Sequence, residues 1–380
     1  MVSQPHGGSL VDLVSKRRIS PKDADELPSL DLTMEVAYTV TNIIHGVFSP
    51  LEGFVTEGDF HSVLRHMRLQ DGLPWTIPAF LSVPEGEEGK AVVQARDVAL
   101  RFEGRAIAVL HAEEVYRFDK KEYCERVFGT ADPAHPGASR ILSGSGMAAS
   151  GRLSFVGEMS NPYAADTRMP DETRTYFKEK GFETVTAFQT RNAPHIGHEY
   201  LQKTALAVTD SVFINPIIGR KKAGDFKDEV IIDSYKALIK HYYPQESVVF
   251  GILRYEMQYA GPKEAIMHAI MRKNFGCTHI VIGRDHAGVG SYYAPYAAQE
   301  IFAEFPDLGI TPLFFKEFYY CKKCAGIANE KICPHGPDQR LNFSGTKLRE
   351  LFESGQRPPA EFMRPEVSDA ILSRKDPFHR

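Results

Sequence analysis

The sequence contains no apolar run approaching the roughly 18 residues that a membrane-spanning helix needs, and its first residues lack the continuous apolar core of a secretory signal. We therefore expect a cytoplasmic protein with no membrane partner. A surplus of positive charge is also missing, since 45 Lys and Arg stand against 49 Asp and Glu and the formal net charge is -4. This balance argues against a nucleic-acid partner held by bulk positive charge, and small anionic ligands fit better.

Two familiar phosphate-binding patterns are absent. No GxxxxGK[ST] loop occurs in the chain, and the glycines of its most glycine-rich candidate loop do not form GxGxxG. We therefore expect no kinase of the P-loop type. Nothing in the sequence recommends a Ser/His/Asp or Cys/His nucleophile system either.

Cysteine is scarce, with five residues in 380, an odd number that argues against a disulfide framework. Three of the five are clustered as Cys321-x2-Cys324-x8-Cys333-x-His335, which places four soft or borderline ligands within fifteen residues. This set suits tetrahedral Zn²⁺, and four protein ligands leave no open position, so we expect a structural metal. Cys124 and Cys277 are interpreted as packing residues.

At 380 residues the chain is too long for one ordinary hydrophobic core, and we expect three domains. Residues 1–165 contain short apolar or alternating runs broken by Gly and Pro, such as those at 76–83, 90–102 and 105–118, which predict a β-rich domain with short helices. The single Trp75 is expected in its core. Residues 321–380 form a small C-terminal domain that carries the metal ligands and a helix near 345–353.

Residues 166–320 alternate between strand-like and helix-like segments, which predicts βαβ units, a parallel sheet covered on both faces and an α/β fold. In such sheets, ligands bind beyond the carboxyl ends of the strands. The strands are predicted at 184–188, 211–218, 247–253, 278–282 and 310–315, and the helices near 198–208, 228–242, 262–274 and 295–305.

The stretch FQTRNAPHIGHE, residues 188–199, is the strongest candidate for a binding site. It reads as a strand end, a turn and a helix start, and a helix start offers unsatisfied N–H groups and a partial positive charge. Gln189, Thr190, Arg191 and Asn192 occupy the turn, followed by an HxGH pattern at His195 and His198. Arg supplies a rigid fork for a tetrahedral oxyanion, and the amides add neutral donors. We expect a phosphate or sulfate cradle here, although HxGH alone could be a capping and packing pattern.

A second candidate, GRDHAGVG at 283–290, follows the predicted strand 278–282. Its glycines, including Gly283, free the backbone to wrap a ligand, while Arg284 and His286 supply charge or donors that Asp285 can orient. The alternative is a glycine-rich turn held by an internal ion pair between the Arg and the Asp.

Three further groups are weaker candidates for binding the ligand. The loop 219–225, GRKKAGD, lies at the predicted ligand edge but could simply be solvated, and Arg254 follows the third strand. The stretch 344–349, SGTKLR, begins a helix. Its Ser344 is either an ordinary N-cap or part of a second phosphate clamp that closes with Lys347 or Arg349.

Taken together, several motifs make the chain similar to the ATP sulfurylase (sulfate adenylyltransferase) family. They span residues 48–367 and comprise FSPLEGF, QTRNxxH..HE, GRKKAGD, YAGPKEAI, GRDHAG, and SGTKLRE followed by RPEV. The resemblance implies a PUA-like N-terminal domain, a Rossmann-like catalytic domain, a small C-terminal domain, no kinase domain and a homo-oligomer. One departure is that Ala193 stands between Asn192 and Pro194, where relatives place Pro directly after the Asn.

The resemblance also implies roles for single residues. Gln189 and Arg191 resemble sulfate ligands, together with the Ala287 backbone N–H. Thr190 and Asn192 match positions of the catalytic motif, and His195 and His198 its phosphate-binding pair. The nucleotide-binding positions that the resemblance implies are Gln189, Asn192, His195, His198, Gly283, Arg284, Asp285 and His286.

The activity so implied is attack of a sulfate oxygen on the α-phosphorus of ATP, carrying Mg²⁺, to give adenosine 5′-phosphosulfate and pyrophosphate, or the reverse reaction that makes ATP. Two other hypotheses stay open at this point. One is a different HxGH nucleotidyltransferase or an aminoacyl-tRNA synthetase relative. The other is a zinc-containing RNA-binding module, which would bind RNA in a salt-sensitive manner without ATP chemistry.

Overall fold

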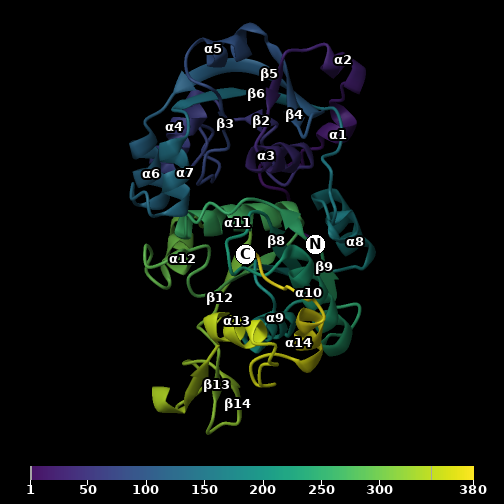
Figure 1. Ribbon diagram of the computed structural model, residues 1–380, viewed down its shortest axis with the longest axis vertical. Helices are drawn as coiled ribbons and strands as arrows, with labels where there is room; N and C mark the ends of the chain where they lie inside the picture. The colour runs from purple at the N-terminus through teal and green to yellow at the C-terminus, as the bar shows by residue number, and fades with distance from the viewer. Residues whose placement is uncertain (1, 344) are drawn as a thin grey trace.

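The computed structural model describes residues 2–343 and 345–380. Figure 1 shows an N-terminal sheet region at one end, a second sheet region in the middle and a small hairpin region at the other end. None of the helices within these described ranges has the length and apolar character needed to cross a membrane.

A mixed sheet organises the N-terminal region. Its strand order is β1-β4-β5-β6-β2, with β3 also paired to β6; β1 and β4 are parallel and the other pairs antiparallel. The elements are α1 (Leu13–Lys16), α2 (Pro21–Asp25), β1 (Ser29–Asp31), α3 (Met34–Ile44), β2 (Gly53–Phe54), α4 (Glu57–His66), β3 (Leu81–Ser82), α5 (Glu87–Gln94), β4 (Asp97–Phe102), β5 (Arg105–Arg117), α6 (Lys120–Phe128), α7 (Pro136–Ser143) and β6 (Met147–Phe155).

Two of the three runs used to predict this region are only partly strand. The run 90–102 begins inside α5, to which Lys90, Ala91 and Gln94 contribute good helix formers, and Arg96 with φ of 59° separates that helix from β4. In the run 76–83 only Leu81 and Ser82 pair with a neighbour, β6. The third run, 105–118, is the long strand β5 as predicted.

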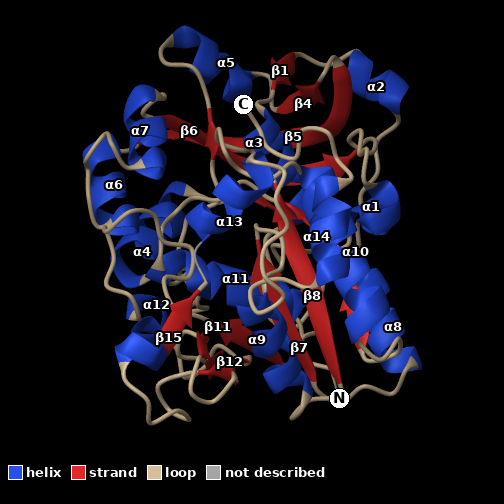
Figure 2. Ribbon diagram, turned by 60° about the horizontal axis from the view of Figure 1, so that its bottom comes forward, coloured by secondary structure: helices blue, strands red, loops and turns tan. Residues whose placement is uncertain are grey.

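The middle region is a parallel sheet in the order β10-β8-β7-β11-β12, with β9 also paired to β8. Figure 2 shows β7 and β8 side by side with α10 and α14 beside them. The elements are a 3₁₀ turn (Ala164–Asp166), α8 (Pro170–Glu179), β7 (Val185–Thr190), α9 (Ile196–Leu206), β8 (Ser211–Ile218), α10 (Asp228–Tyr242), β9 (Val248–Phe250), β10 (Leu253–Arg254), α11 (Pro262–Asn274), β11 (His279–Ile282), α12 (Ala297–Glu300), a 3₁₀ turn (Ile301–Glu304) and β12 (Thr311–Phe314).

The parallel sheet confirms the prediction of an α/β fold, and β8, α10 and α11 have the predicted bounds. The strand predicted over 247–253 is interrupted, because the Gly251 and Ile252 N–H groups donate to Ile214 and Asp166 and the chain bends between β9 and β10. The helix predicted near 295–305 tightens after α12 into a 3₁₀ turn.

Both faces of the central strands of the parallel sheet are buried. Ala187 and Phe213 pack with α11 in a core that continues into the N-terminal region. Phe188 and Ile214, one residue further along β7 and β8, point to the other face and pack with α10. Continuous apolar strands are what a sheet covered on both faces requires.

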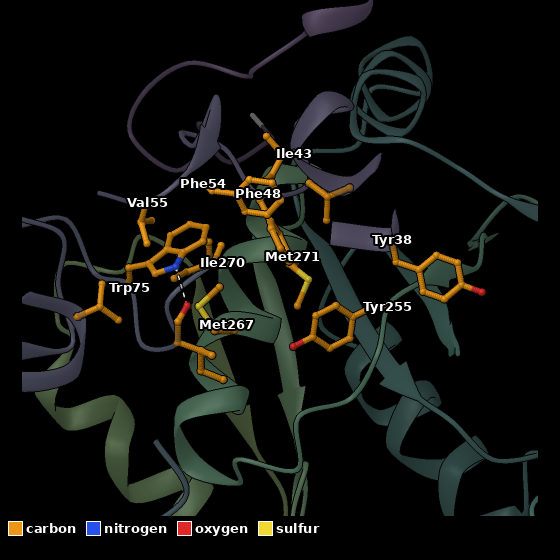
Figure 3. Packing of buried hydrophobic residues seen from close by; sticks show 14 of the residues in the cluster. Tyr38, Ile43, Phe48, Phe54, Val55, Trp75, Tyr255, Met267, Ile270 and Met271 are labelled. Atoms are coloured by element: carbon orange, nitrogen blue, oxygen red, sulfur yellow. Dashed lines mark hydrogen bonds between the residues drawn. The ribbon is translucent and has the colours of Figure 1, made fainter. Parts of the chain in front are cut away.

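The junction between the N-terminal region and the middle region is one apolar core. In Figure 3, Phe48 and Trp75 approach Met267 and Met271 of α11. Trp75 is fully buried, as predicted, and its indole N–H donates to the Ile77 carbonyl at 2.8 Å. The two regions are therefore packed as one body, with α11 between the N-terminal region and the parallel sheet.

The C-terminal 60 residues have two kinds of packing. A three-stranded sheet, in the order β14-β13-β15, has a small buried cluster of its own made of Tyr319, Cys321, Ala328 and Cys333. The last helices instead share the core of the parallel sheet, because Phe352 and Val367 pack with residues of α10. The division of the chain into three domains stays a prediction. The elements are β13 (Tyr319–Cys321), β14 (Gly326–Ala328), a 3₁₀ turn (Pro337–Gln339), β15 (Arg340–Asn342), α13 (Gly345–Glu353) and α14 (Pro365–Leu372).

Candidate active site

The candidate stretch 188–199 lies at the carboxyl end of β7 and the start of α9. Gln189 and Thr190 belong to the strand, which ends two residues later than predicted, and the helix begins at Ile196 rather than near residue 198. His195 is the N-cap: its backbone is extended, and its Nδ1 accepts the His198 backbone N–H at 3.3 Å. Capping was the alternative explanation of the HxGH pattern in the sequence analysis, and it is observed for His195, although the usual caps are Ser, Thr, Asp and Asn.

The two histidines of the HxGH pattern are stacked. Their ring centroids lie 3.8 Å apart at an interplanar angle of 18°, and Phe343 stacks on the other face of His195 at 5.2 Å. The Phe188 ring meets the edge of His198 at 5.7 Å. This desolvation lowers the pKa of His198 from 6.5 to about 4 and the pKa of His195 well below its ordinary value.

Both imidazoles are therefore neutral at pH 7, and each has one ring N–H to donate. Because His195 accepts with Nδ1, its proton is assigned to Nε2. The Nδ1 of His198 is buried without a partner in the described part of the chain. The pair can thus act as neutral hydrogen-bond donors, supported by the partial positive charge at the start of α9.

A cavity of about 390 Å³ joins this stretch to the loop 283–290. All the candidate ligand residues of both segments line it, which agrees with the rule that ligands bind beyond the carboxyl ends of parallel strands, because β7 and β11 are neighbours. The lining residues that the sequence predicted are Gln189, Thr190, Arg191, Asn192, His195, His198, Gly283, Arg284, Asp285, His286 and Ala287.

Arg191 is held by an aromatic residue rather than by a carboxylate. Its Nη1–H donates to the Tyr259 hydroxyl at 2.8 Å, and its guanidinium carbon lies 5.0 Å from the centre of that ring. The Lys222 ammonium lies 4.4 Å from the same ring centre, and burial together with the Arg191 charge lowers the pKa of Lys222. Because the Tyr259 ring is neutral, it does not cancel the positive charge of these two side chains as a carboxylate would. Both cations can therefore attract an incoming anion.

The loop after β11 turns sharply. Asp285 and Ala287 both have φ of 56°, a left-handed conformation that costs a residue with a side chain about 1 kcal/mol or more. The alternative of an internal Arg284–Asp285 ion pair is wrong: Arg284 Nη1 instead lies 3.3 Å from Glu317 Oε2, and both side chains are partly exposed. No such partner was predicted, although Glu317 follows β12, the parallel neighbour of β11.

Sequence reasoning missed several residues of the cavity wall. Lys316, Glu317 and Phe318 follow β12, and the rule on carboxyl ends of strands would have found them. Phe343 lies one residue after β15 and reaches His195 only through the fold. Tyr259 is not among the described residues that line the cavity but holds Arg191; it belongs to a motif used for the family resemblance, and no role was predicted for it.

Two of the weaker basic candidates, Arg254 and Lys221, use their side chains for contacts within the protein. Arg254 is 7% exposed, donates through Nη1 to the Ser160 carbonyl at 2.6 Å and lies 5.4 Å from the Tyr38 ring centre. Lys221 forms an ion pair with Asp228 at 2.9 Å. Neither side chain lines the 390 Å³ cavity.

The clamp predicted from 344–349 stays a prediction. Ser344 lies outside the described residues, and Lys347 and Arg349 lie on α13, which begins at Gly345. Neither Lys347 nor Arg349 is among the described residues that line the cavity.

A larger cavity of about 470 Å³ lies in the N-terminal region beside α3 and α7, between residues such as Phe80 and Ile141. Its walls are mostly apolar, and none of the predicted site residues lines it. A site for anionic reactants needs converging cations and hydrogen-bond donors, so the smaller cavity is the candidate active site.

The four predicted metal ligands come together in the hairpin region. Their donor atoms all lie within 4.8 Å of one another. The His335 Nδ1 lies 3.4, 3.2 and 3.5 Å from the sulfurs of Cys321, Cys324 and Cys333, and the last two sulfurs are 3.8 Å apart. Tetrahedral Zn²⁺ would separate sulfur from nitrogen by about 3.6 Å and two sulfurs by about 3.8 Å, so the group fits a metal ion of this kind.

The start of α9 is anchored by the C-terminal segment. Arg364 donates through Nε and Nη2 to the two carboxylate oxygens of Glu199, both at 2.8 Å, and Lys203 lies 2.6 Å from the same carboxylate. Burial alone would raise the pKa of Glu199, but these donors hold it below its ordinary value. The Ile196 N–H also donates to the Phe362 carbonyl at 2.9 Å.

We expect Arg364→Ala to lower the free energy of unfolding by about 3 kcal/mol, because the Glu199 carboxylate, which is 1% exposed, loses its bidentate partner. Urea denaturation measures this change. The matched control is Arg357→Ala, which breaks an ion pair with Asp369 whose side chains are 53% and 55% exposed and is expected to cost under about 1 kcal/mol. Equal losses in the two variants would contradict the anchoring role.

Comparison with known proteins agrees with this geometry. A family model described as ATP-sulfurylase matches residues 166–374. The chain belongs to the ATP-sulfurylase family. A second model, described as a PUA-like domain, matches residues 3–158, so the predicted combination of a PUA-like N-terminal domain with an ATP-sulfurylase domain is confirmed.

Full-length relatives carry the same family name. A sulfate adenylyltransferase of Hyperthermus butylicus is 53% identical over 381 residues, covering 100% of this chain and 98% of the relative. One of Pyrococcus abyssi is 51% identical over 383 residues, covering 100% of both. Among solved structures, a hexameric APS kinase from Thiobacillus denitrificans matches with a TM-score of 0.75 and 21% identity, over 99% of this chain and 69% of that one, which shows a shared fold.

Proposed function

We propose that this member of the ATP-sulfurylase family is a sulfate adenylyltransferase. A sulfate oxygen attacks the α-phosphorus of ATP, the new P–O bond replaces the bond to the β-phosphate, and pyrophosphate leaves; the reverse reaction makes ATP. One observation carries the proposal: Arg191, the HxGH pair and the loop 283–290 line one cavity at the carboxyl edge of the sheet. Full-length similarity to sulfate adenylyltransferases supports it.

We divide the cavity into two halves. Gln189, Arg191 and the Ala287 backbone N–H bind sulfate, because the guanidinium fork fits a tetrahedral oxyanion and is kept free of carboxylates by Tyr259. His195 and His198 bind the phosphate groups of ATP. Gln189, Asn192, Gly283, Arg284, Asp285 and His286 complete the nucleotide site, and Thr190 supports the turn through the Asn192 N–H, which donates to its hydroxyl at 3.2 Å.

The reaction needs no covalent intermediate with the protein. Both reactants are anions, so the protein aligns them and stabilises charge that develops on the α-phosphoryl and pyrophosphate oxygens. Neutral imidazoles suit this task, since each can donate a hydrogen bond to a phosphate oxygen without transferring its proton. Mg²⁺ arrives with ATP as part of the substrate and neutralises phosphate charge.

The Cys/His group is proposed to hold Zn²⁺ as a structural ion. Cys321, Cys324, Cys333 and His335 are its ligands, and when bound the metal would link the turn between β13 and β14 to the segment between β14 and β15. Assembly into a homo-oligomer and a cytoplasmic location stay predictions. The two other hypotheses, a different HxGH nucleotidyltransferase and an RNA-binding module, are not favoured, because the similarity to sulfate adenylyltransferases covers the whole chain.

The purified protein is expected to form ATP from adenosine 5′-phosphosulfate and pyrophosphate and to release pyrophosphate from ATP only when sulfate is present. A coupled luciferase assay measures the first reaction, and molybdate in place of sulfate gives a parallel forward assay. Salt-sensitive RNA binding in a protein that performs neither reaction would contradict the proposal and favour the RNA-binding alternative.

A further inference from the structure

Helix α11 carries an unusual polar stripe through the interior of the protein. Glu264, His268 and Arg272 occur at intervals of four residues, so they lie along one face of the helix. All three are 0% exposed, between the core of the N-terminal region and the parallel sheet. Ionisable groups in such a place destabilise a fold unless they are paired, so packing alone does not explain the stripe.

Glu264 holds the loop that precedes its own helix. Its Oε1 accepts the Gln258 N–H at 2.8 Å, and its Oε2 accepts the Ala260 N–H at 3.0 Å. Between these two residues Tyr259 has φ of 61°, a conformation that a bulky aromatic residue rarely adopts. The carboxylate therefore fixes, from both sides, the residue whose hydroxyl holds Arg191.

His268 reaches the other wall of the cavity. Its Nδ1 lies 3.0 Å from Nε2 of His286, which lines the cavity, and its Nε2 faces Glu264 Oε1 at 3.6 Å. The two loops also touch directly, because the Gly261 N–H donates to the Ala287 carbonyl at 3.1 Å. One buried stripe thus contacts the loop 256–261 and the loop 283–290 at once.

We propose that Glu264 and His268 are positioning residues that set the distance between the Arg191 guanidinium and the Ala287 backbone N–H, and so the fit of a tetrahedral oxyanion between them. The proposal rests on the sulfate half of the proposed function. Neither residue lines the cavity, and each acts through another group: Glu264 through Tyr259, and His268 through His286.

Arg272 supplies the matched control. It lies on the same helix face with the same burial, but its side-chain hydrogen bond goes to the Asn215 carbonyl at 3.3 Å, and no hydrogen bond or ion pair among the described residues joins its side chain to either loop. Its Nε and Nη1 have no partner in the described part of the chain. Arg272→Leu removes a buried polar group of the stripe without touching the cavity walls.

The first test compares Glu264→Gln, His268→Leu and Arg272→Leu in the full chain by amide hydrogen exchange. We expect faster exchange in residues 256–261 for Glu264→Gln, in residues 283–290 for His268→Leu, and in neither segment for Arg272→Leu. This readout does not depend on the reaction, so it stays informative if the proposed activity is absent. Unchanged exchange in both loops for the first two variants would overturn the proposal.

The second test measures KM for sulfate, KM for MgATP and the free energy of unfolding. We expect His268→Leu to raise KM for sulfate by about tenfold or more, because a small displacement of a binding group has a large effect. We expect KM for MgATP to rise by a smaller factor, since His286, through which His268 acts, is also assigned to the nucleotide site. His268→Asn, which keeps a hydrogen-bonding atom near the position of Nδ1, is expected to restore most of the loss. A lower stability with an unchanged KM for sulfate would mean a purely structural role.

A double mutant separates the two routes. If His268 acts through His286, adding His268→Leu to His286→Ala is expected to raise KM for sulfate no further than His286→Ala alone. Additive effects would contradict this route. If the wild-type protein performs no sulfate-dependent reaction, but the variants exchange faster in the two loops, the proposed function is refuted. The positioning of the two loops by Glu264 and His268 is then still supported.

Discussion

Replacing Arg191 with alanine is expected to lower kcat/KM for sulfate by about 10³-fold, because the variant loses the one guanidinium fork that lies against the neutral Tyr259 ring. The loss is expected in sulfate-dependent pyrophosphate release. Binding of ATP is expected to change much less, since the HxGH pair lies at the start of α9 and keeps its ring stack. The Arg191–Tyr259 contact is a single hydrogen bond between partly buried side chains, so its loss is not expected to unfold the protein.

Two controls make the result specific. Arg191→Lys keeps the charge but not the fork and is expected to recover only part of the activity, because lysine binds an oxyanion as a point charge. Arg105→Ala removes an exposed cation at the start of β5 and is expected to behave like the wild type. Turnover of Arg191→Ala within about threefold of the wild type would remove Arg191 from the sulfate site.

Removing the metal is expected to unfold the hairpin region. Its buried cluster contains only Tyr319, Cys321, Ala328 and Cys333, and two of these are metal ligands, so little apolar burial is left without the ion. We expect about one Zn²⁺ per chain. A chelator is expected to make the segment 322–340 sensitive to protease and to lower activity, since Phe343 follows this segment and stacks on His195.

Cysteine variants test the same point without a chelator. Cys324→Ser is expected to lose the zinc and to gain the protease-sensitive site. Cys124→Ser changes a buried cysteine outside the group and is expected to keep the zinc. A metal-free protein whose hairpin resists protease as well as the wild type would show that side-chain packing alone holds this region.

Local signals explain why some elements could be predicted to the residue. Helix α11 begins with Pro262 at its first position, and α10 has Asp228 and Glu229 in its first turn, both common at helix starts. Strand β8 is apolar at nearly every position, as a strand buried on both faces must be. The interruption at Gly251 could not be predicted, because it depends on contacts with residues 36 or more positions away.

The part of the site formed at the carboxyl ends of neighbouring parallel strands could be predicted from the sequence. Residues 189–198 and 283–287 follow adjacent parallel strands, so the carboxyl-end rule brings them to one cavity. The site was not predictable where the contact is made across the fold. The Phe343–His195 stack and the contact of His268 with His286 join segments whose proximity no periodicity encodes.

The most direct test of the divided cavity is a crystal structure with adenosine 5′-phosphosulfate bound. We expect its sulfate group within hydrogen-bond distance, about 3 Å, of the Arg191 guanidinium and the Ala287 N–H, with the phosphoryl group facing His195 and His198. An electron density for the ligand in the 470 Å³ cavity beside α3, or a sulfate group turned toward the two histidines with Arg191 left unoccupied, would contradict the account.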